Sequence, residues 1–401
     1  MIVSQYFWPE NFRINDIAVG LQEKGHQVTV LTGLPNYPEG KFYPGYSFFN
    51  KSSENWQGIE IIRAREFPRG RNQSWRLALN YISFVFFAGW KALWLKSRFD
   101  KVLVFQQSPI FLTIPAIIVK KRQRIPLYVI VQDLWPESLL FTGKTTNKLI
   151  LQLVSKVSDY IYHQADCLLL PSNGFKDSLS KRGIDVSAMQ YLPNSTESYY
   201  QPVEKDEKYA QWFTGKCHLL LAGNLGEAQG LHLIINAAKE LHIQHPDLRW
   251  ILVGDGRMRV ELELFVKELG LDNIILFPGR VPATEVPKWI AWADATLLTL
   301  KKDPLFTVTI PSRLQTYMAC GKPVLASIDG EAAQLIREAD CGLAAPAEDT
   351  AAFVQVVQQF LNKSQEKQMQ WGSQGRDYYL RNFERNYLIE KLHQQLSNAT
   401  C

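Results

Sequence analysis

The sequence has few cysteines and little else that suggests metal or disulfide chemistry. Its five cysteines are scattered along 401 residues, and none belongs to a C-x-x-C pair. We therefore expect neither a zinc site nor a disulfide framework, and a reducing, cytoplasmic compartment is the simpler interpretation. Low-complexity segments and repeats of solenoid length are also lacking. The first residues are typical of a β-strand rather than of a basic leader with an apolar core, so we infer no signal peptide.

An uninterrupted apolar run of membrane-spanning length is absent as well. The most apolar stretch, residues 75–95, is broken by Arg76, Asn80 and Lys91, and its runs are shorter than the roughly 20 residues that a bilayer requires. Its aromatic residues and charged flanks are typical of a helix that covers a sheet and rests partly on a membrane. We expect this membrane-facing surface to include Arg69, Arg71, Trp75, Phe86, Phe87, Trp90, Lys120, Lys121 and Arg122.

Positive charge is concentrated in the first half of the chain. Residues 1–200 carry 23 Lys+Arg and 15 Asp+Glu, whereas residues 201–401 carry 21 and 24. This asymmetry indicates an anionic partner for the first half. A membrane surface is the favoured partner and an ordinary solvated surface the second interpretation. Nucleic acid is disfavoured, because helix-turn-helix, zinc-finger and aromatic RNA-binding motifs are missing.

What the sequence does contain is two series of short apolar runs that alternate with amphipathic stretches. This rhythm predicts βαβ units and parallel sheets buried on both faces. The predicted strands are residues 27–32, 59–63, 101–105, 127–132 and 167–171, then 218–222, 249–253, 274–277, 295–300 and 323–327. The predicted helices include residues 15–24, 148–163, 231–242 and 257–269.

The fold class expected is α/β, with two Rossmann-like, doubly wound domains that face a cleft. We place the domains at residues 1–200 and 201–375, joined by a polar linker over residues 193–214. Residues 376–401 are expected to form a C-terminal helix that packs back towards the first domain. Ligands of such folds bind at the carboxyl ends of the strands.

Two glycine loops follow predicted strands of the second domain. One is Val253-Gly254-Asp255-Gly256, and the other is Ala222-Gly223-Asn224-Leu225-Gly226. Glycine lets the backbone approach a ligand closely, and a following helix N-terminus offers N–H groups to anions. Each loop alone could be an ordinary strand-to-helix turn, and the G-x-G-x-x-G dinucleotide spacing is absent. Two such loops on one sheet edge favour a phosphate-binding role.

An arginine stands in the first turn of another predicted helix, at Pro311-Ser312-Arg313. Cations usually avoid this end of the helix dipole, so a phosphate that neutralises Arg313 would explain its position. A solvated arginine is the alternative.

In the first domain, Asp133 ends a predicted strand within Gln132-Asp133-Leu134-Trp135-Pro136. It could accept a hydrogen bond from a sugar hydroxyl or act as a base, or it could simply cap the next helix.

These motifs together resemble the retaining GT-B glycosyltransferase family four. Within that family the sequence is similar to bacterial polysaccharide enzymes that include colanic-acid transferases and WbuB-like L-fucosamine transferases. The resemblance covers nearly the whole chain. Its carriers are residues 4–10 (SQYFWPE), 25–32 (GHQVTVLT), 35–38 (PNYP), 132–136 (QDLWP), 222–224 (AGN), 253–256 (VGDG) and 318–324 (MACGKPV).

The resemblance implies a nucleoside diphosphate sugar held mainly by the second domain, an acceptor held by the first, and no metal or other cofactor. Three departures from the family pattern stand out. Asn224 and Gln229 occupy positions where the family has Arg and Lys beside the diphosphate. Val308 and Thr316 replace its two glutamates, and residues 11–13 replace the glycine pair of its first loop.

Loss of two cations beside a diphosphate removes charge-assisted hydrogen bonds that a leaving group needs. We hypothesise that other arginines supply them, helped by the backbone of residues 224–226. The sugar-nucleotide site then comprises Arg13, Asn224, Gly226, Gly254, Arg257, Arg280, Ser312, Arg313 and Thr316.

The function expected is therefore transfer of N-acetyl-L-fucosamine, or another deoxy or amino sugar, from a UDP-sugar to an undecaprenyl-diphosphate-linked saccharide, with retention. Such an enzyme would be peripheral on the cytoplasmic face of a bacterial inner membrane, in O-antigen, capsule or exopolysaccharide synthesis. Asp133 is the candidate catalytic carboxylate. The alternatives are a sugar-nucleotide epimerase, a GDP-sugar-dependent fucosyltransferase and an inactive binding protein.

Overall fold

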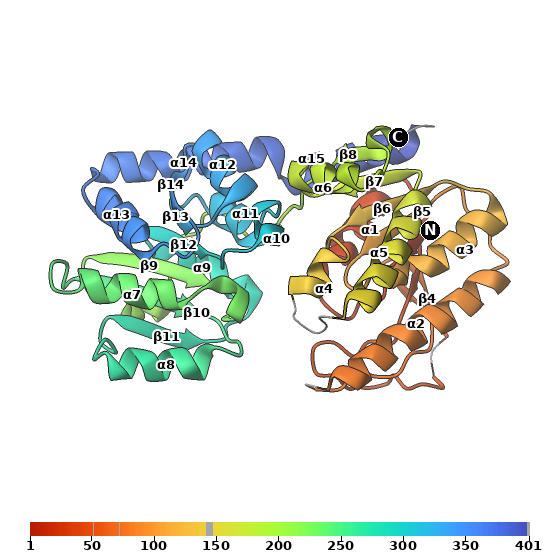
Figure 1. The fold of residues 1–401 in the computed structure, drawn as a ribbon, viewed down its shortest axis with the longest axis horizontal. Helices are drawn as coiled ribbons and strands as arrows, with labels where there is room; N and C mark the ends of the chain where they lie inside the picture. Colours follow the sequence, from red (N-terminus) through yellow and green to blue (C-terminus); the bar gives the residue numbers. More distant parts are fainter. Residues whose placement is uncertain (51, 72, 142–146, 399–401) are drawn as a thin grey trace. The chain divides into compact units, whose positions relative to one another are not determined.

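The chain forms two compact units in the computed structural model, which describes residues 1–50, 52–71, 73–141 and 147–398 (Figure 1). Unit 1 comprises Met1–Pro193 together with the segment that begins at Leu388, and unit 2 comprises Asn194–Tyr387. The sequence predicted domain boundaries at residues 200 and 375. In the structure both boundaries differ: unit 2 already begins at Asn194, and residues 376–382 complete one of its helices before the chain returns to unit 1.

Unit 1 is built on an eight-stranded sheet with the order β3-β4-β2-β1-β5-β6-β7-β8. Neighbouring strands pair in parallel, except that β3 runs antiparallel to β4. Its strands are β1 (Ile2–Val3), β2 (Thr29–Thr32), β3 (Ser53–Trp56), β4 (Ile59–Arg63), β5 (Val102–Gln106), β6 (Leu127–Val131), β7 (Cys167–Leu170) and β8 (Met189–Tyr191).

Helices cover the sheet of unit 1, and the last helix of the chain is one of them. On one face α1 and α15 pack over β1, β2 and β5. A Cβ at Gly20 in α1 would lie 2.8 Å from the Ile389 side chain, so only glycine permits this close approach of the two helices. The helices are α1 (Arg13–Glu23), α2 (Ser74–Trp94), α3 (Ile114–Gln123), α4 (Glu137–Phe141), α5 (Lys148–His163), α6 (Asn173–Lys181) and α15 (Arg385–Ser397), with short 3-10 turns at Ile110–Thr113 and Val186–Ala188.

Unit 2 is built on a six-stranded sheet with the order β11-β10-β9-β12-β13-β14, and all of its neighbours pair in parallel. Its strands are β9 (Cys217–Ala222), β10 (Leu248–Val253), β11 (Ile275–Gly279), β12 (Ala295–Thr299), β13 (Val324–Ser327) and β14 (Gly342–Ala345). Its helices are α7 (His232–Leu241), α8 (Arg259–Glu268), α9 (Val286–Trp292), α10 (Pro304–Thr307), α11 (Ser312–Ala319), α12 (Gly330–Glu338), α13 (Thr350–Leu361) and α14 (Gln365–Asn382).

Both faces of the unit 2 sheet are buried under helices (Figure 1). Leu219 and Leu221 of β9 pack towards α7, α8 and α13. The alternate residues Leu220 and Ala222 pack towards α9, α11 and α12. Strands buried on both sides read as continuous apolar runs, which is why the sequence identified them. The predicted fold class, two Rossmann-like α/β domains with parallel sheets, is confirmed.

The segment predicted as a polar linker is more ordered than its composition indicates. Within it, residues Glu207–Trp212 form a 3-10 turn. Tyr209 is buried there, its ring centroid lies 4.7 Å from that of Trp289, and its hydroxyl donates to Glu285 at 2.6 Å. The aromatic residues of this segment are thus part of the unit 2 core.

One cysteine forms a disulfide, although the sequence predicted reduced thiols. Cys167, the first residue of β7, is disulfide-bonded, whereas Cys217, Cys320 and Cys341 are free. Disulfide pairing depends on the distance between side chains in the fold, which the spacing of cysteines in the sequence does not give.

Candidate active site

Three loops meet at the carboxyl edge of the unit 2 sheet, after β9, β10 and β11. The Gly223 N–H donates to the Val253 carbonyl at 2.9 Å, and the Gly254 N–H donates to the Gly279 carbonyl at 2.9 Å. Farther out, the Leu225 N–H donates to the Asp255 carbonyl at 2.9 Å. The two glycine loops noted in the sequence therefore lie against each other on one sheet edge.

Gly254 occupies the tightest position of this edge. Its φ is 143°, and a Cβ there would lie 1.8 Å from the Gly223 carbonyl oxygen. Any side chain at this position would push the two loops apart. The glycines thus allow a backbone surface close enough for a phosphate to approach.

Arg313 lies beneath the β9 loop. Its Nη2 donates to the Asn224 carbonyl at 2.6 Å, and a Cβ at Gly223 would lie 2.8 Å from its Nε. One turn farther along α11, the Tyr317 hydroxyl accepts from the Ala222 N–H at 3.0 Å and fixes the helix to the strand. The arginine predicted from the sequence is therefore in contact with the glycine loop.

The charge of Arg313 is not balanced by a carboxylate within the described part of the chain. Its Nη1 is buried and has no hydrogen-bond partner among the described residues. Burial lowers the pKa of the guanidinium, and the Tyr317 side chain partly offsets this effect. An arginine remains protonated at neutral pH even so. A half-buried cation with a buried, unused donor beside glycine loops is suited to bind an anion.

The other predicted arginines of unit 2 are more exposed. Arg257 and Arg280 are solvent-exposed side chains. The helix expected from residue 257 begins at Arg259, and a Cβ at Gly279 would lie 3.1 Å from Nη1 of this residue. Arg259 also pairs with Glu263 at 2.8 Å. Arg259, which the sequence interpretation passed over, is therefore the α8 cation that contacts the loop edge.

The remaining predicted residues of unit 2 surround Arg313. Ser312 is the exposed first residue of α11, and the Asn224 amide lies next to Gly226. Thr316, at a position where the family has a glutamate, lies 3.3 Å from Thr196 through the two hydroxyl oxygens. Arg13 is the first residue of α1 in unit 1, and its part in nucleotide binding stays a prediction.

Asp133 follows β6 at the carboxyl edge of the unit 1 sheet. Its Oδ2 accepts from the Ser108 hydroxyl at 2.7 Å, and its backbone carbonyl accepts from Gln106 at 3.2 Å. Burial raises the pKa of Asp133, and the two hydrogen bonds from Ser108 oppose that shift. Among the described residues, its side-chain partner is Ser108 and not the backbone of α4. Asp133 therefore does not cap α4 in the described structure, and its role in substrate binding stays a prediction.

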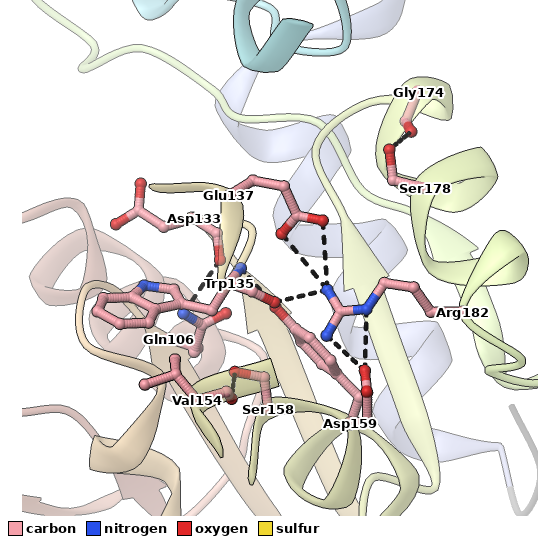
Figure 2. A network of polar contacts seen from close by, with 11 residues as sticks. Gln106, Asp133, Trp135, Glu137, Val154, Ser158, Asp159, Gly174, Ser178 and Arg182 are labelled. Carbon is pink, nitrogen blue, oxygen red and sulfur yellow. Dashed lines mark hydrogen bonds and ion pairs between the residues drawn. The ribbon is translucent and has the colours of Figure 1, made fainter. Parts of the chain in front are cut away.

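A polar network holds the Asp133 loop in place (Figure 2). Arg182 donates to the Trp135 carbonyl at 2.5 Å and to Asp159 at 2.5 and 2.9 Å, and it lies 3.4 Å from Glu137. In Figure 2 the Asp133 carboxylate points away from Arg182. The Trp135 indole N–H donates to the Ser108 hydroxyl at 3.0 Å. Arg182 and Ser108 thus hold the loop through Trp135, and the Asp133 carboxylate points away from Arg182. A side chain held in one orientation in this way is preorganised.

Two buried glutamates at the same edge were not singled out from the sequence. Glu10 accepts from the N–H groups of Asn36 and Tyr37 at 2.7 and 2.6 Å. Glu66 accepts from Gln5 at 3.0 Å and from Asn36 at 2.7 Å. The signal was present, because Glu10 and Asn36 belong to two motifs that carry the family resemblance. The structure brings these two motifs into contact through the Asn36 N–H and the Glu10 carboxylate.

The buried glutamates make stability depend on pH. Burial raises the pKa of Glu10 to about 7 from an ordinary 4.5, against the effect of its backbone hydrogen bonds and of Arg63. The folded state therefore binds more protons than the unfolded state between pH 4.5 and 7. We expect stability to fall by about 3 kcal/mol as pH rises through this window. Burial shifts the pKa of Glu66 upward as well, in the same direction.

Urea unfolding at pH 5, 6, 7 and 8 tests this expectation. The Glu10→Gln variant keeps an acceptor for the two N–H groups but cannot ionise, so its stability should vary less with pH than that of the wild type. A wild type that becomes more stable from pH 5 to 7, with that gain lost in Glu10→Gln, would contradict the expectation.

In the predicted membrane face, three aromatic side chains of α2 are exposed, whereas the basic side chains contact other residues of the protein. Trp75, Phe86 and Trp90 of α2 are 64%, 63% and 58% exposed. The large exposed side chains of α2 recur every three or four residues and so form one stripe. They are Trp75, Leu79, Ile82, Phe86, Trp90, Leu93 and Trp94.

The predicted basic residues of this face have partners within the protein. Arg69 lies over the Tyr37 ring at 4.9 Å, and Arg71 pairs with Glu39. Lys120 pairs with Asp166 at 2.7 Å. Lys121 donates to the Tyr160 hydroxyl at 2.8 Å, and Arg122 donates to the Leu95 carbonyl at 2.5 Å.

Helix α2 has the length and composition of a membrane-crossing helix, with 21 residues and a mean hydropathy of 1.2 over its most apolar 18-residue window. It is nevertheless part of unit 1. A third of its most apolar window is buried, it packs on α3, and its Asn80 donates to the Phe67 carbonyl at 2.7 Å. Among the described residues, no group of three His, Cys, Asp or Glu side chains is arranged to hold a metal ion.

Comparisons with known proteins decide the family. The model of the glycosyl transferase 4-like domain matches residues 11–195, and the model of glycosyl transferases group 1 matches residues 203–378. The chain is a group 1 glycosyltransferase with the GT-B fold. The match to the 4-like domain covers most of the sheet of unit 1, and the match to group 1 covers the sheet of unit 2.

The glycosyltransferase is similar to individual proteins of known sequence or structure. It is 23% identical to the colanic acid biosynthesis glycosyl transferase WcaI of Escherichia coli K12, over 75% of each chain. Sucrose-phosphate synthase of Thermosynechococcus elongatus shares its fold with a TM-score of 0.76 and 17% identity, over 99% of this chain and 97% of the other. HepE of Anabaena, solved in complex with UDP, shares the fold with a TM-score of 0.71 and 16% identity, over 99% of this chain and 98% of the other. These matches do not favour the epimerase alternative.

Proposed function

We propose that this glycosyltransferase transfers a sugar from a UDP-sugar to an undecaprenyl-diphosphate-linked saccharide during synthesis of a bacterial O-antigen, capsule or exopolysaccharide. The observation that carries the proposal is the half-buried guanidinium of Arg313 beside the glycine loops of unit 2, whose buried Nη1 has no partner among the described residues. A diphosphate supplies the missing negative charge and can accept from the unused Nη1 donor. The similarity to WcaI supports a polysaccharide product, and the UDP complex of HepE supports the choice of base.

In this proposal the reaction proceeds with retention and without a metal. Arg313, the β9 and β10 loop backbones and the N-terminus of α11 stabilise the leaving UDP, with Arg259 nearby. In unit 1, Asp133 orients the acceptor through hydrogen bonds to a sugar hydroxyl. The transferred sugar is N-acetyl-L-fucosamine or another deoxy or amino sugar. The enzyme works as a peripheral protein on the cytoplasmic face of the inner membrane, with the exposed stripe of α2 towards the lipid.

A thermal-shift screen tests the donor half of the proposal. UDP, GDP, ADP and dTDP are each added to the protein at millimolar concentration without divalent metal. Bound ligand at 100 times its Kd stabilises the folded state by about 2.7 kcal/mol, which raises Tm by a few degrees for a protein of this size. We expect UDP to give the largest rise. A larger rise with GDP would support the GDP-sugar alternative, and no rise with any nucleotide would contradict the proposal.

A further inference from the structure

A pocket in unit 1 opens beside the exposed stripe of α2. Its volume is about 530 Å³, which is within the range of small-molecule sites. Aromatic side chains from two parts of the chain form its walls, because the loop after residue 47 lies against α2. They are Phe48, Phe49, Phe86, Phe87 and Trp90.

The pocket is positively charged. Arg63, Arg65 and Lys91 line it, and no carboxylate does so among the described residues. Arg63 is neutralised by Glu54 at 2.5 Å. Arg65 instead lies over the rings of Phe48 and Phe49, at 5.6 and 5.7 Å. Two cations, Arg65 and Lys91, thus face an aromatic pocket without an ion pair in the described structure.

The environment of Lys91 indicates that this charge is uncompensated. Its Nζ has a long hydrogen bond of 3.4 Å to the Ser52 carbonyl, and it is half-buried. Burial lowers the pKa of Lys91, and the positive charge of Arg65 lowers it further. Two like charges held close together in a partly apolar site are stabilised when an anion binds between them.

The walls of the pocket continue into the exposed stripe. Phe86 and Trp90 line the pocket and are also more than half exposed, and Phe49 is 81% exposed. An apolar chain that leaves the pocket can therefore continue along the exposed side chains of Ile82, Phe86 and Trp90. Such a combination of two cations and an adjoining apolar path fits an amphiphile with a doubly charged head.

We propose that this pocket binds the diphosphate of a lipid diphosphate, with the lipid chain on the exposed stripe of α2. The inference rests on the proposed function and extends it, since it assigns a site for the lipid diphosphate of the acceptor. Arg65 and Lys91 contact the two phosphates, and Phe48, Phe49 and Trp90 cover the first part of the chain. A lipid with a single phosphate leaves one of the two cations unpaired and should bind less well.

Vesicle co-sedimentation with three lipid compositions tests the proposal. The vesicles contain phosphatidylcholine with undecaprenyl diphosphate, phosphatidylcholine with phosphatidylglycerol at equal negative charge, or phosphatidylcholine alone. The wild type should bind the diphosphate vesicles about tenfold more tightly than the phosphatidylglycerol vesicles. The double variant Arg65→Gln/Lys91→Gln should lose this preference and keep the weaker binding that both anionic vesicles share.

The matched control is Lys96→Gln/Arg98→Gln, which removes the same charge just beyond the C-terminus of α2 at two exposed residues. It should lower binding to both anionic vesicles equally and leave the preference intact. An unchanged preference in Arg65→Gln/Lys91→Gln, or an equal loss of preference in the control, would overturn the pocket assignment. The UDP-induced rise in Tm, measured on each variant, reports folding and tests the donor site separately. If that rise is present, only the pocket assignment fails.

Discussion

Replacing Arg313 with alanine should lower kcat/KM for sugar transfer by about 100- to 1000-fold, the range found when a main donor to a developing oxyanion is removed. Arg313 donates to the Asn224 carbonyl and keeps a second, buried donor without a partner among the described residues. In the proposed reaction this donor binds the diphosphate, whose negative charge grows as the sugar leaves. The loss should therefore appear in kcat as well as in KM.

Two variants separate charge from geometry at this position. Arg313→Lys keeps a positive charge but lacks the planar fork, so its kcat/KM should lie between those of the wild type and Arg313→Ala. Arg337→Ala is the control, because Arg337 is an exposed arginine in the last turn of α12. It should leave kinetics and the UDP-induced Tm rise unchanged. If Arg313→Ala also leaves both unchanged, Arg313 does not bind the donor.

Replacing Asp133 with asparagine should lower kcat for transfer by about 10- to 100-fold, as expected for loss of a charged hydrogen bond to substrate. Asparagine keeps an oxygen that can accept from the Ser108 hydroxyl, so the loop held by Arg182 should retain its structure. The changed property is the carboxylate charge. Because Asp133 belongs to unit 1 and the nucleotide loops to unit 2, the UDP-induced Tm rise should not change.

The control for Asp133 is Asp177→Asn, an identical change of charge at an exposed residue of α6. It should leave transfer unaffected. If Asp133→Asn transfers sugar as fast as the wild type, the carboxylate has only a structural role at the end of β6. If it instead abolishes the response to UDP, Asp133 acts on the donor rather than on the acceptor.

Local pattern determined most of the strands and helices. Runs such as residues 127–131 and 250–253 are apolar on both faces, and this property is intrinsic to a central parallel strand. Three strands escaped the pattern. The edge strand β3 (Ser53–Trp56) is largely polar, β8 (Met189–Tyr191) is only three residues long, and three of the four residues of β14 (Gly342–Ala345) are glycine or alanine, which have weak strand preference. Each of the three lies at the edge of its sheet and pairs with one neighbouring strand, so its strand conformation depends on that pairing rather than on its own residues.

The candidate site was also predicted only where its residues carry a local sequence signal. The glycine loops and Arg313 carry local signals, namely a glycine after each strand and a cation at a helix start, and the structure brings them into contact. The sequence could not indicate that Arg259 rather than Arg257 contacts this edge, because a two-residue shift in the start of α8 decides which arginine turns towards Gly279.

The sequence by itself determined the two α/β domains, the glycine loops, the basic first half and the aromatic helix α2. The glycine loops and the aromatic helix follow from residue types within a few positions of one another, and the domains and the charge follow from composition and pattern summed along the chain. Only the tertiary structure decided that Glu10 holds the loop of Asn36, that Arg182 holds the loop of Asp133, and that Phe48 and Trp90 enclose one pocket. Such contacts join residues 26 to 47 positions apart, and the order of strands in the sheet, which places them side by side, is not encoded in any local segment.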